Sequence, residues 1–152
     1  MRLSPAKAIA FGALTVGTLD ILDAFIFFYV RSGARPMRIL QGIAAGLMGR
    51  NAAIQGGVKT AALGLALHFF IATCIVTVYF LASRVFPVLR RHTLICGAVY
   101  GPIVWAFMNY VVIPHSATGG GGTPVTPVLI NGLLIHIFGV GLPSALFARM
   151  AR

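Results

Sequence analysis

Four apolar runs divide this 152-residue chain, and each is long enough to cross a membrane as a helix. The hydrocarbon core of a bilayer is about 30 Å thick and requires about 20 helical residues. Only 9% of the residues are charged, against about 25% in a soluble domain, so the chain has too few polar groups to cover a surface that faces water. The sequence therefore predicts an all-α polytopic membrane protein. We expect a single transmembrane domain over residues 1–152, a four-helix transmembrane bundle with spans at about 8–30, 60–82, 93–113 and 126–148.

The connection between the first two runs contains a shorter apolar segment, PMRILQGIAAGLMGR, at about residues 36–50. Helical spacing places five of its apolar residues on one face: Leu40, Ile43, Ala44, Leu47 and Met48. The segment is too short to span a bilayer. We therefore predict an interfacial amphipathic helix between spans one and two, which lies on the membrane surface or folds into the mouth of the bundle.

Basic residues far outnumber acidic ones, with 12 Lys and Arg against 2 Asp and Glu. In a soluble protein this excess would indicate nucleic acid, but here the basic residues lie between apolar runs, so the predicted partners are the lipid bilayer and its anionic lipids, not nucleic acid. The residues assigned to lipid headgroups are Arg38, Arg50, Arg90 and Arg91. Seven Lys and Arg residues lie on the side of the two termini and five on the other side, which favours cytoplasmic termini.

Both acidic residues of the chain, Asp20 and Asp23, lie within the first apolar run, in the stretch GTLDILDAFIFFYV. They are three residues apart, so they share one helix face. A charged acid at the centre of a span costs about 2.5–3.5 kcal/mol on insertion scales, and such residues usually face the bundle interior and have a partner. Two ionised carboxylates on one face repel each other, so either one acid stays protonated or a cation lies between the acids and the histidines. If one acid is protonated, we expect it to be Asp20, and Asp23, nearer the interface, to be ionised.

Depth along the helices places three more polar residues near these acids. With a rise of about 1.5 Å per residue, Asp23 lies about 10 Å from one membrane face and Asn109 about 6 Å from it. His68 and His136 lie about 12 Å and 15 Å from the same face. The histidines occupy similar segments, GLALHFF and GLLIHIF, whose glycines allow close helix approach, as do Gly97 and Gly101 in the third run. The sequence predicts a shared ligand or proton-relay site of Asp20, Asp23, His68, His136 and Asn109, with Asp23 near a histidine.

Three interpretations of this Asp–His set stay open. The residues can simply form hydrogen bonds between helices, which average about 0.6 kcal/mol each. They can form a ligand site, in which His68, His136 and Asp23 hold a transition metal or the two histidines bind haem. They can also form a path for protons or cations.

The leading functional hypothesis is a small membrane binding or accessory protein, either a subunit of a larger membrane complex or a homo-oligomer. The alternative is a small proton- or cation-translocating transporter or channel that uses the same residues. An enzyme comes third, because the sequence has no dinucleotide-binding GxGxxG, no P-loop and no HExxH motif.

The second half of the chain, from about Gly64 to Arg149, carries four short features together. They are the histidine in GLALHFF, the RVFP that ends this run, the VVIP that closes the third run, and a histidine in the last run. In these features the chain resembles the YagU-like family of small bacterial inner-membrane proteins. The resemblance implies a location in a bacterial inner membrane. It implies no reaction, because the family has no settled activity.

Overall fold

The structure is a computed structural model that describes residues 3–120 and 124–151. Within these residues the secondary structure is helical, apart from one isolated bridge between Leu3 and Ala151. Four helices of the described chain are long and apolar enough to cross a membrane: Pro5–Ser32, Gly57–Val85, Thr93–Val112 and Thr126–Met150. The predicted all-α class and the four long apolar helices are confirmed.

Three of the four long helices extend beyond the predicted apolar runs, and the caps of α1 show where such a helix begins and ends. Helix α1, Pro5–Ser32, begins after Ser4, whose Oγ accepts a hydrogen bond from the backbone nitrogen of Lys7 at 3.4 Å. It ends at Gly33, which has a φ of 68°. This left-handed conformation suits glycine because glycine has no Cβ. The second long helix is α4, Gly57–Val85.

The third and fourth long helices each contain a π-helical segment. Helix α6, Thr93–Phe107, continues into η1, Met108–Val112. The fourth is built from α7, Thr126–Ile135, then η2, His136–Gly141, then α8, Leu142–Met150. Pro143 has no backbone N–H, so it cannot bond to the carbonyl of Gly139 four residues earlier, and η2 lies directly before it. Such segments are frequent at functional sites, and here they contain Asn109 and His136.

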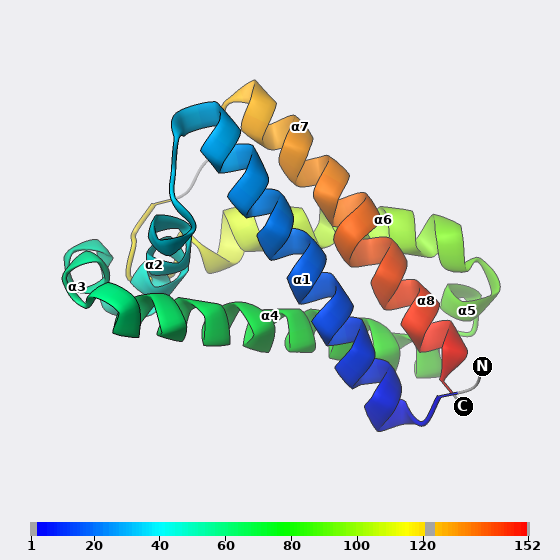
Figure 1. Cartoon of the computed structure of the whole chain (residues 1–152). Helices are drawn as coiled ribbons and strands as arrows, with labels where there is room; N and C mark the ends of the chain where they lie inside the picture. Colours follow the sequence, from blue (N-terminus) through cyan, green and yellow to red (C-terminus); the bar gives the residue numbers. More distant parts are fainter. Residues whose placement is uncertain (1–2, 121–123, 152) are drawn as a thin grey trace.

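Successive long helices run in opposite directions; in the view of Figure 1, α1 and the fourth long helix slope between top and bottom, while α4 and α6 lie nearly horizontal. Helix α1 packs against α4 on one side and against η2 and α8 on the other, while α6 packs against η2 and α8. Helices α4 and α6 meet through Tyr100, whose Oη donates to the carbonyl of Ile75 at 2.8 Å. The two ends of the described chain lie together, because the backbone nitrogen of Leu3 donates to the carbonyl of Met150 at 2.9 Å.

Short helices occupy both ends of the bundle. Helix α5, Val88–Arg91, lies near the termini, and α2 and α3 lie at the opposite end (Figure 1). Helices α2, Pro36–Met48, and α3, Arg50–Gln55, are separated at Gly49, where φ is 82°. The helix predicted at about 36–50 corresponds to α2, which ends two residues earlier than expected, and α3 is a further short helix that was not predicted. The position of α2 at a membrane interface stays a prediction.

The buried face of α2 differs from the expected one. Gln41, Ala44 and Ala45 are buried, whereas Leu47 and Met48, which periodicity grouped with Leu40, are exposed. The reason is the close approach of α2 to α4 at Gly64, where an added Cβ would overlap the carbonyl of Leu40. At such a short separation, small side chains fill the contact and larger ones are turned outward.

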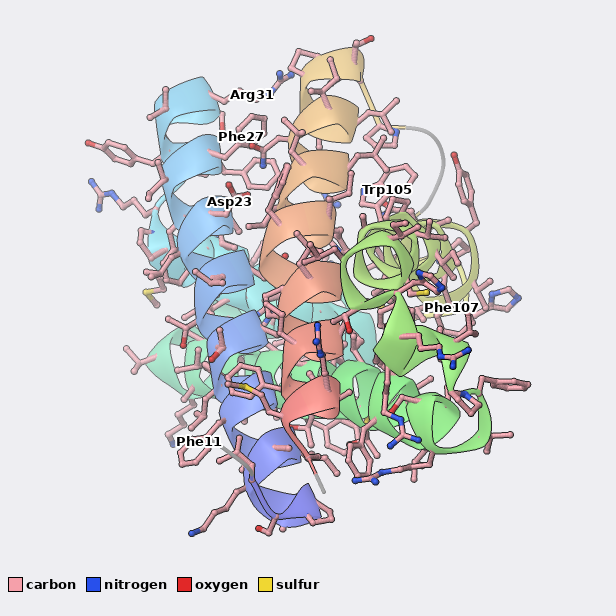
Figure 2. All side chains as sticks on the ribbon, turned by 90° about the vertical axis from the view of Figure 1, so that its right-hand side faces the viewer. Phe11, Asp23, Phe27, Arg31, Trp105 and Phe107 are labelled. Carbon is pink, nitrogen blue, oxygen red and sulfur yellow. The ribbon has the colours of Figure 1, made fainter. Side chains whose placement is uncertain are left out.

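Much of the apolar surface of the long helices faces outward. In the most apolar window of each helix, at most 33% of the residues are buried inside the structure. Phe11 and Phe107 point away from the bundle, whereas Asp23 and Phe27 point from α1 towards the fourth long helix (Figure 2). The fold therefore combines an apolar exterior with a mostly apolar core, into which α1 directs Asp23.

Candidate functional site

A cavity of about 350 Å³ lies inside the bundle, and every residue of the predicted polar site lines it. Asp20 and Asp23 come from α1, His68 from α4, Asn109 from η1 and His136 from η2. The four long helices therefore all contribute to one polar space. This agrees with the expected inward orientation of the two histidines.

Glycines set the positions of the helices around this cavity. An added Cβ on Gly101 of α6 would overlap the carbonyl of His136, and one on Gly141 would overlap the carbonyl of Gly97. The expected packing role of Gly97 and Gly101 is thus realised against η2, the segment that carries His136. On α1, Gly17 allows the ring of Phe69 to approach, since an added Cβ would lie 2.6 Å from that ring.

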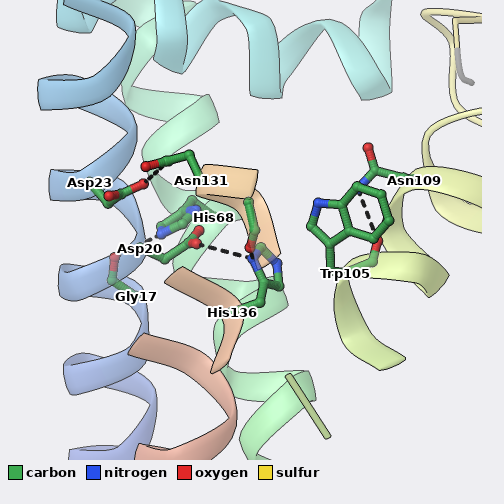
Figure 3. Close-up of polar contacts among 9 residues, drawn as sticks. Gly17, Asp20, Asp23, His68, Trp105, Asn109, Asn131 and His136 are labelled. Carbon is green, nitrogen blue, oxygen red and sulfur yellow. Dashed lines mark hydrogen bonds and ion pairs between the residues drawn. The ribbon is translucent and has the colours of Figure 1, made fainter. Parts of the chain in front are cut away.

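Each histidine is fixed by a hydrogen bond to a backbone carbonyl (Figure 3). His68 Nε2 lies 2.8 Å from the carbonyl oxygen of Gly17, and His136 Nδ1 lies 2.9 Å from that of Gly132. A carbonyl oxygen only accepts, so both of these ring nitrogens carry hydrogen and donate. In a neutral imidazole the other ring nitrogen then has a lone pair and can accept a hydrogen bond.

The two acids have different surroundings. Asp23 Oδ2 accepts a hydrogen bond from Asn131 Nδ2 at 2.7 Å. Asp20 Oδ1 lies 4.0 Å from His136 Nδ1, which is within ion-pair range but beyond hydrogen-bond distance. Asp20 accepts no hydrogen bond from any residue that the structure describes, and 28% of its side chain is exposed. One acid is thus held by an amide, and the other is free to receive a donor in the cavity.

These contacts change the expected pairing. The sequence placed Asp23 beside a histidine, whereas its hydrogen-bond partner is Asn131 and the acid close to His136 is Asp20. Asn109 uses its amide on the carbonyl of Trp105, at 2.9 Å within the same helix.

The sequence predicted five of the residues that line the cavity; among the others, Asn131 and Trp105 bear most on its chemistry. An amide within the fourth apolar run was the available signal for Asn131. Nothing in the sequence around Trp105 distinguishes a residue that lines a cavity from one that packs against a neighbouring helix.

The structure offers no ligand set for the metal hypothesis. Among residues 3–120 and 124–151, no three His, Cys, Asp or Glu side chains lie close enough together to hold a metal ion. His68, His136 and Asp23 share the cavity wall but do not converge on one point. The metal and haem interpretations therefore gain no support from the geometry.

Comparison with family models, curated proteins and solved structures finds no significant match. The YagU-like resemblance and the bacterial location that it implies therefore stay predictions. What the protein does must be inferred from the cavity itself.

The predicted headgroup residues lie at opposite ends of the bundle. Arg38 and Arg50 line a second cavity of about 260 Å³ together with Gln41 and Thr118. Gln41 is buried, and its Nε2 donates to the carbonyl of Gly57 at 3.1 Å, which ties α2 to the start of α4. Arg90 and Arg91 belong to α5, and the Nε of Arg90 is buried with no hydrogen-bond partner among the described residues.

Proposed function

We propose that this chain is an integral membrane protein whose interior cavity binds a small ligand. Two observations support membrane insertion: four apolar helices of sufficient length, and large apolar side chains on the outer surface. Extended apolar patches on soluble proteins mark interaction surfaces or lead to aggregation, whereas lipid would cover such a surface completely. On this proposal the protein is a small membrane binding or accessory protein, acting as a subunit of a complex or as a homo-oligomer.

The observation that carries the ligand-binding role is the convergence of the polar residues. Both acids of the chain and two of its four histidines line one cavity, although they come from three different long helices. Ionisable groups within a bilayer are costly and usually mark binding sites or ion paths. A protein that needed only stability could fill this space with apolar side chains, which often stabilise as well as a buried ion pair does.

A second candidate function is proton or cation translocation. It is favoured by the 4.0 Å separation of Asp20 and His136, because neighbouring Asp and His residues form proton relays in membrane transporters. Proton translocation would change the internal pH of sealed vesicles that contain the protein, and translocation of another cation would change their internal content of that cation, whereas ligand binding alone would change neither. These measurements separate the two candidates.

Cysteine labelling tests whether the cavity is a hydrated site inside a lipid-covered bundle. The native cysteines, Cys74 and Cys96, are first replaced by alanine. We then expect Ala24→Cys, whose side chain lines the cavity on α1, to react with a water-soluble methanethiosulfonate reagent in lipid vesicles. The thiolate is the reactive species and needs water to form. The extent of modification is measured by mass spectrometry.

The matched control is Ile26→Cys, two residues further along α1 on a side chain that is 67% exposed. Lipid should cover this position, so we expect no modification in vesicles. Equal reaction at both positions would contradict membrane insertion. No reaction at Ala24→Cys would contradict a hydrated cavity.

We also propose that Arg38 and Arg50 bind anionic lipid headgroups in their cavity, with Arg90 and Arg91 doing so at the other end. The chain has only two acidic residues, and both line the central cavity, so no side-chain carboxylate is left to pair with these arginines. The excess of basic residues on the side of the termini supports cytoplasmic termini. The resemblance stated above supports a bacterial inner membrane.

Removing both arginines of the second cavity should weaken lipid retention. Each basic residue near an anionic surface contributes about 1 kcal/mol, so Arg38→Gln with Arg50→Gln should weaken retention roughly 30-fold. Native mass spectrometry with phosphatidylglycerol and phosphatidylcholine measures it. The control, Arg31→Gln with Lys59→Gln, removes the same charge at the same end but outside this cavity. An equal loss in both double variants would exclude a specific site.

A further inference from the structure

The central cavity is the acidic region of a strongly basic chain. The formal net charge is +10, yet both acidic side chains line this space. Neither Lys nor Arg is among the described residues that line it. The group nearest to the Asp20 carboxylate that can carry positive charge is the ring of His136, whose Nδ1 lies 4.0 Å from Asp20 Oδ1. The local charge of the cavity is therefore opposite in sign to that of the protein as a whole.

The polar atoms that remain available in the cavity are mainly acceptors. Asn131 uses one of its two amide N–H groups on Asp23, and Asn109 uses one of its own on the carbonyl of Trp105, so each keeps one donor beside its acceptor oxygen. His68 and His136 each donate one ring N–H to a backbone carbonyl, so their other nitrogens accept when the rings are neutral. The carboxylate of Asp20 accepts no hydrogen bond from the described residues. Acceptors therefore outnumber donors in the cavity, and the ligand that complements it best donates hydrogen bonds or carries positive charge.

The walls of the cavity favour an organic ligand over an inorganic ion. Phe27, Phe28 and Trp105 line it together with several aliphatic side chains. Such walls cannot replace the oxygen ligands that Ca²⁺ or Mg²⁺ require, and no three metal-ligating side chains converge among the described residues. Aromatic rings do attract organic cations through their faces. The volume of about 350 Å³ lies at the small end of the range for ligand pockets.

We infer that the ligand of the central cavity is a small organic cation, an amine or quaternary ammonium with an apolar body. Its charged group would lie beside Asp20, which would then be ionised, as in the arrangement where a cation offsets the repulsion between the two acids. Its apolar part would lie against the aromatic wall that includes Trp105. This inference rests on the proposed ligand-binding function and names the substrate class of that same site. Ile39 and Ile43 of α2 also line the cavity, so its outer end lies on the side of α2.

The test uses benzyltrimethylammonium as the probe and the fluorescence of Trp105, the single tryptophan of the chain, as the signal. We expect a saturable fluorescence change with purified full-length protein in lipid vesicles. Neopentylbenzene, which has the same shape without the charge, and benzenesulfonate, which has the opposite charge, should produce no saturable change. This comparison needs no variant, so it does not depend on whether a substituted protein folds.

The matched variants are Asp20→Asn and Val88→Lys, which raise the net charge by the same amount. Asp20→Asn should weaken binding of the probe by about tenfold to a hundredfold, the range expected for losing one charged partner. Val88→Lys, on α5 at the far end of the bundle, should leave binding unchanged. Equal weakening by both variants would show a general charge effect and overturn the inference.

The inference and the proposed function can fail separately. Saturable binding of the neutral or anionic probe, or no binding of any probe while Ala24→Cys is still labelled, would show that the cavity exists and that the ligand class is wrong. No binding together with no labelling of Ala24→Cys would overturn the proposed function as well.

Discussion

Replacing Gly101 by alanine should strongly disrupt the contact between α6 and η2. The new Cβ would overlap the carbonyl oxygen of His136 and would lie 2.8 Å from the Cα of Ile137. Both obstacles are backbone atoms, so no change of side-chain rotamer can relieve the overlap. Overpacking usually costs about 1–3 kcal/mol, and a forced separation of two helix backbones should reach or exceed the upper end of that range. Thermal unfolding in mild detergent, followed by circular dichroism, measures the loss.

The matched control is Gly42→Ala in α2. Gly42 is also helical, but no heavy atom lies within 4 Å of its added Cβ. Alanine is about 1 kcal/mol better than glycine in a helix, so this variant should be slightly more stable than the parent. If Gly101→Ala were as stable as Gly42→Ala, the close contact between α6 and η2 would be wrong, and the placement of His136 at the cavity would lose its main support.

The contact at Gly101 illustrates what the sequence could and could not predict. The spacing of Gly97 and Gly101 indicated close helix packing, and that prediction is correct. The segment that packs against these glycines could not be identified, because the spacing of the two glycines indicates only that one face of α6 has no bulky side chains. The partner is η2, whose π-helical geometry depends on how Pro143 and its neighbours are accommodated in the folded bundle. Hydropathy does not report on this property.

The polar residues that line the cavity were easier to predict than the hydrogen bonds between them. Depth along each helix grouped Asp20, Asp23, His68 and His136, because the rise per residue of a helix is fixed. Asn131 was not included, because it lies five positions before His136. On an ideal helix this places the two side chains about 140° apart, on different faces. Residues so far apart on a helix line one space only if the space wraps around that helix. The pairing of Asp23 with Asn131 also joins residues 108 apart in sequence, beyond the reach of any local pattern.

Loss of the Asn131 amide should produce the second large effect on stability. In Asn131→Leu the carboxylate of Asp23 loses the donor that lies 2.7 Å away and gains no other partner. Hydrogen bonds to charged groups contribute about 1.5–3 kcal/mol, and Asp23 is only partly buried, so water in the cavity can replace part of the lost bond. We therefore expect the free energy of unfolding to fall by about 2 kcal/mol. Thermal unfolding in the same detergent measures this change.

Exchanging the two side chains shows whether the hydrogen bond between Asp23 and Asn131 is responsible for the loss of stability. In the double variant Asp23→Asn with Asn131→Asp, the amide and the carboxylate change places between α1 and α7, so most of the lost stability should return. Asp20→Asn is the control that should change stability by less than about 0.5 kcal/mol, because Asp20 accepts no hydrogen bond from the described residues and an amide has nearly the same shape.

The exchanged protein also separates structure from binding. It keeps two carboxylates on the cavity wall, one of them the unchanged Asp20, so it should bind the organic cation as the parent protein does, whereas Asp20→Asn should bind it about tenfold to a hundredfold more weakly. An exchanged protein that is as unstable as Asn131→Leu would mean that the bond between α1 and α7 does not form. A stable exchanged protein that binds no cation would instead assign the binding role to Asp23 at its original position, and the function of the two acids would have to be reversed.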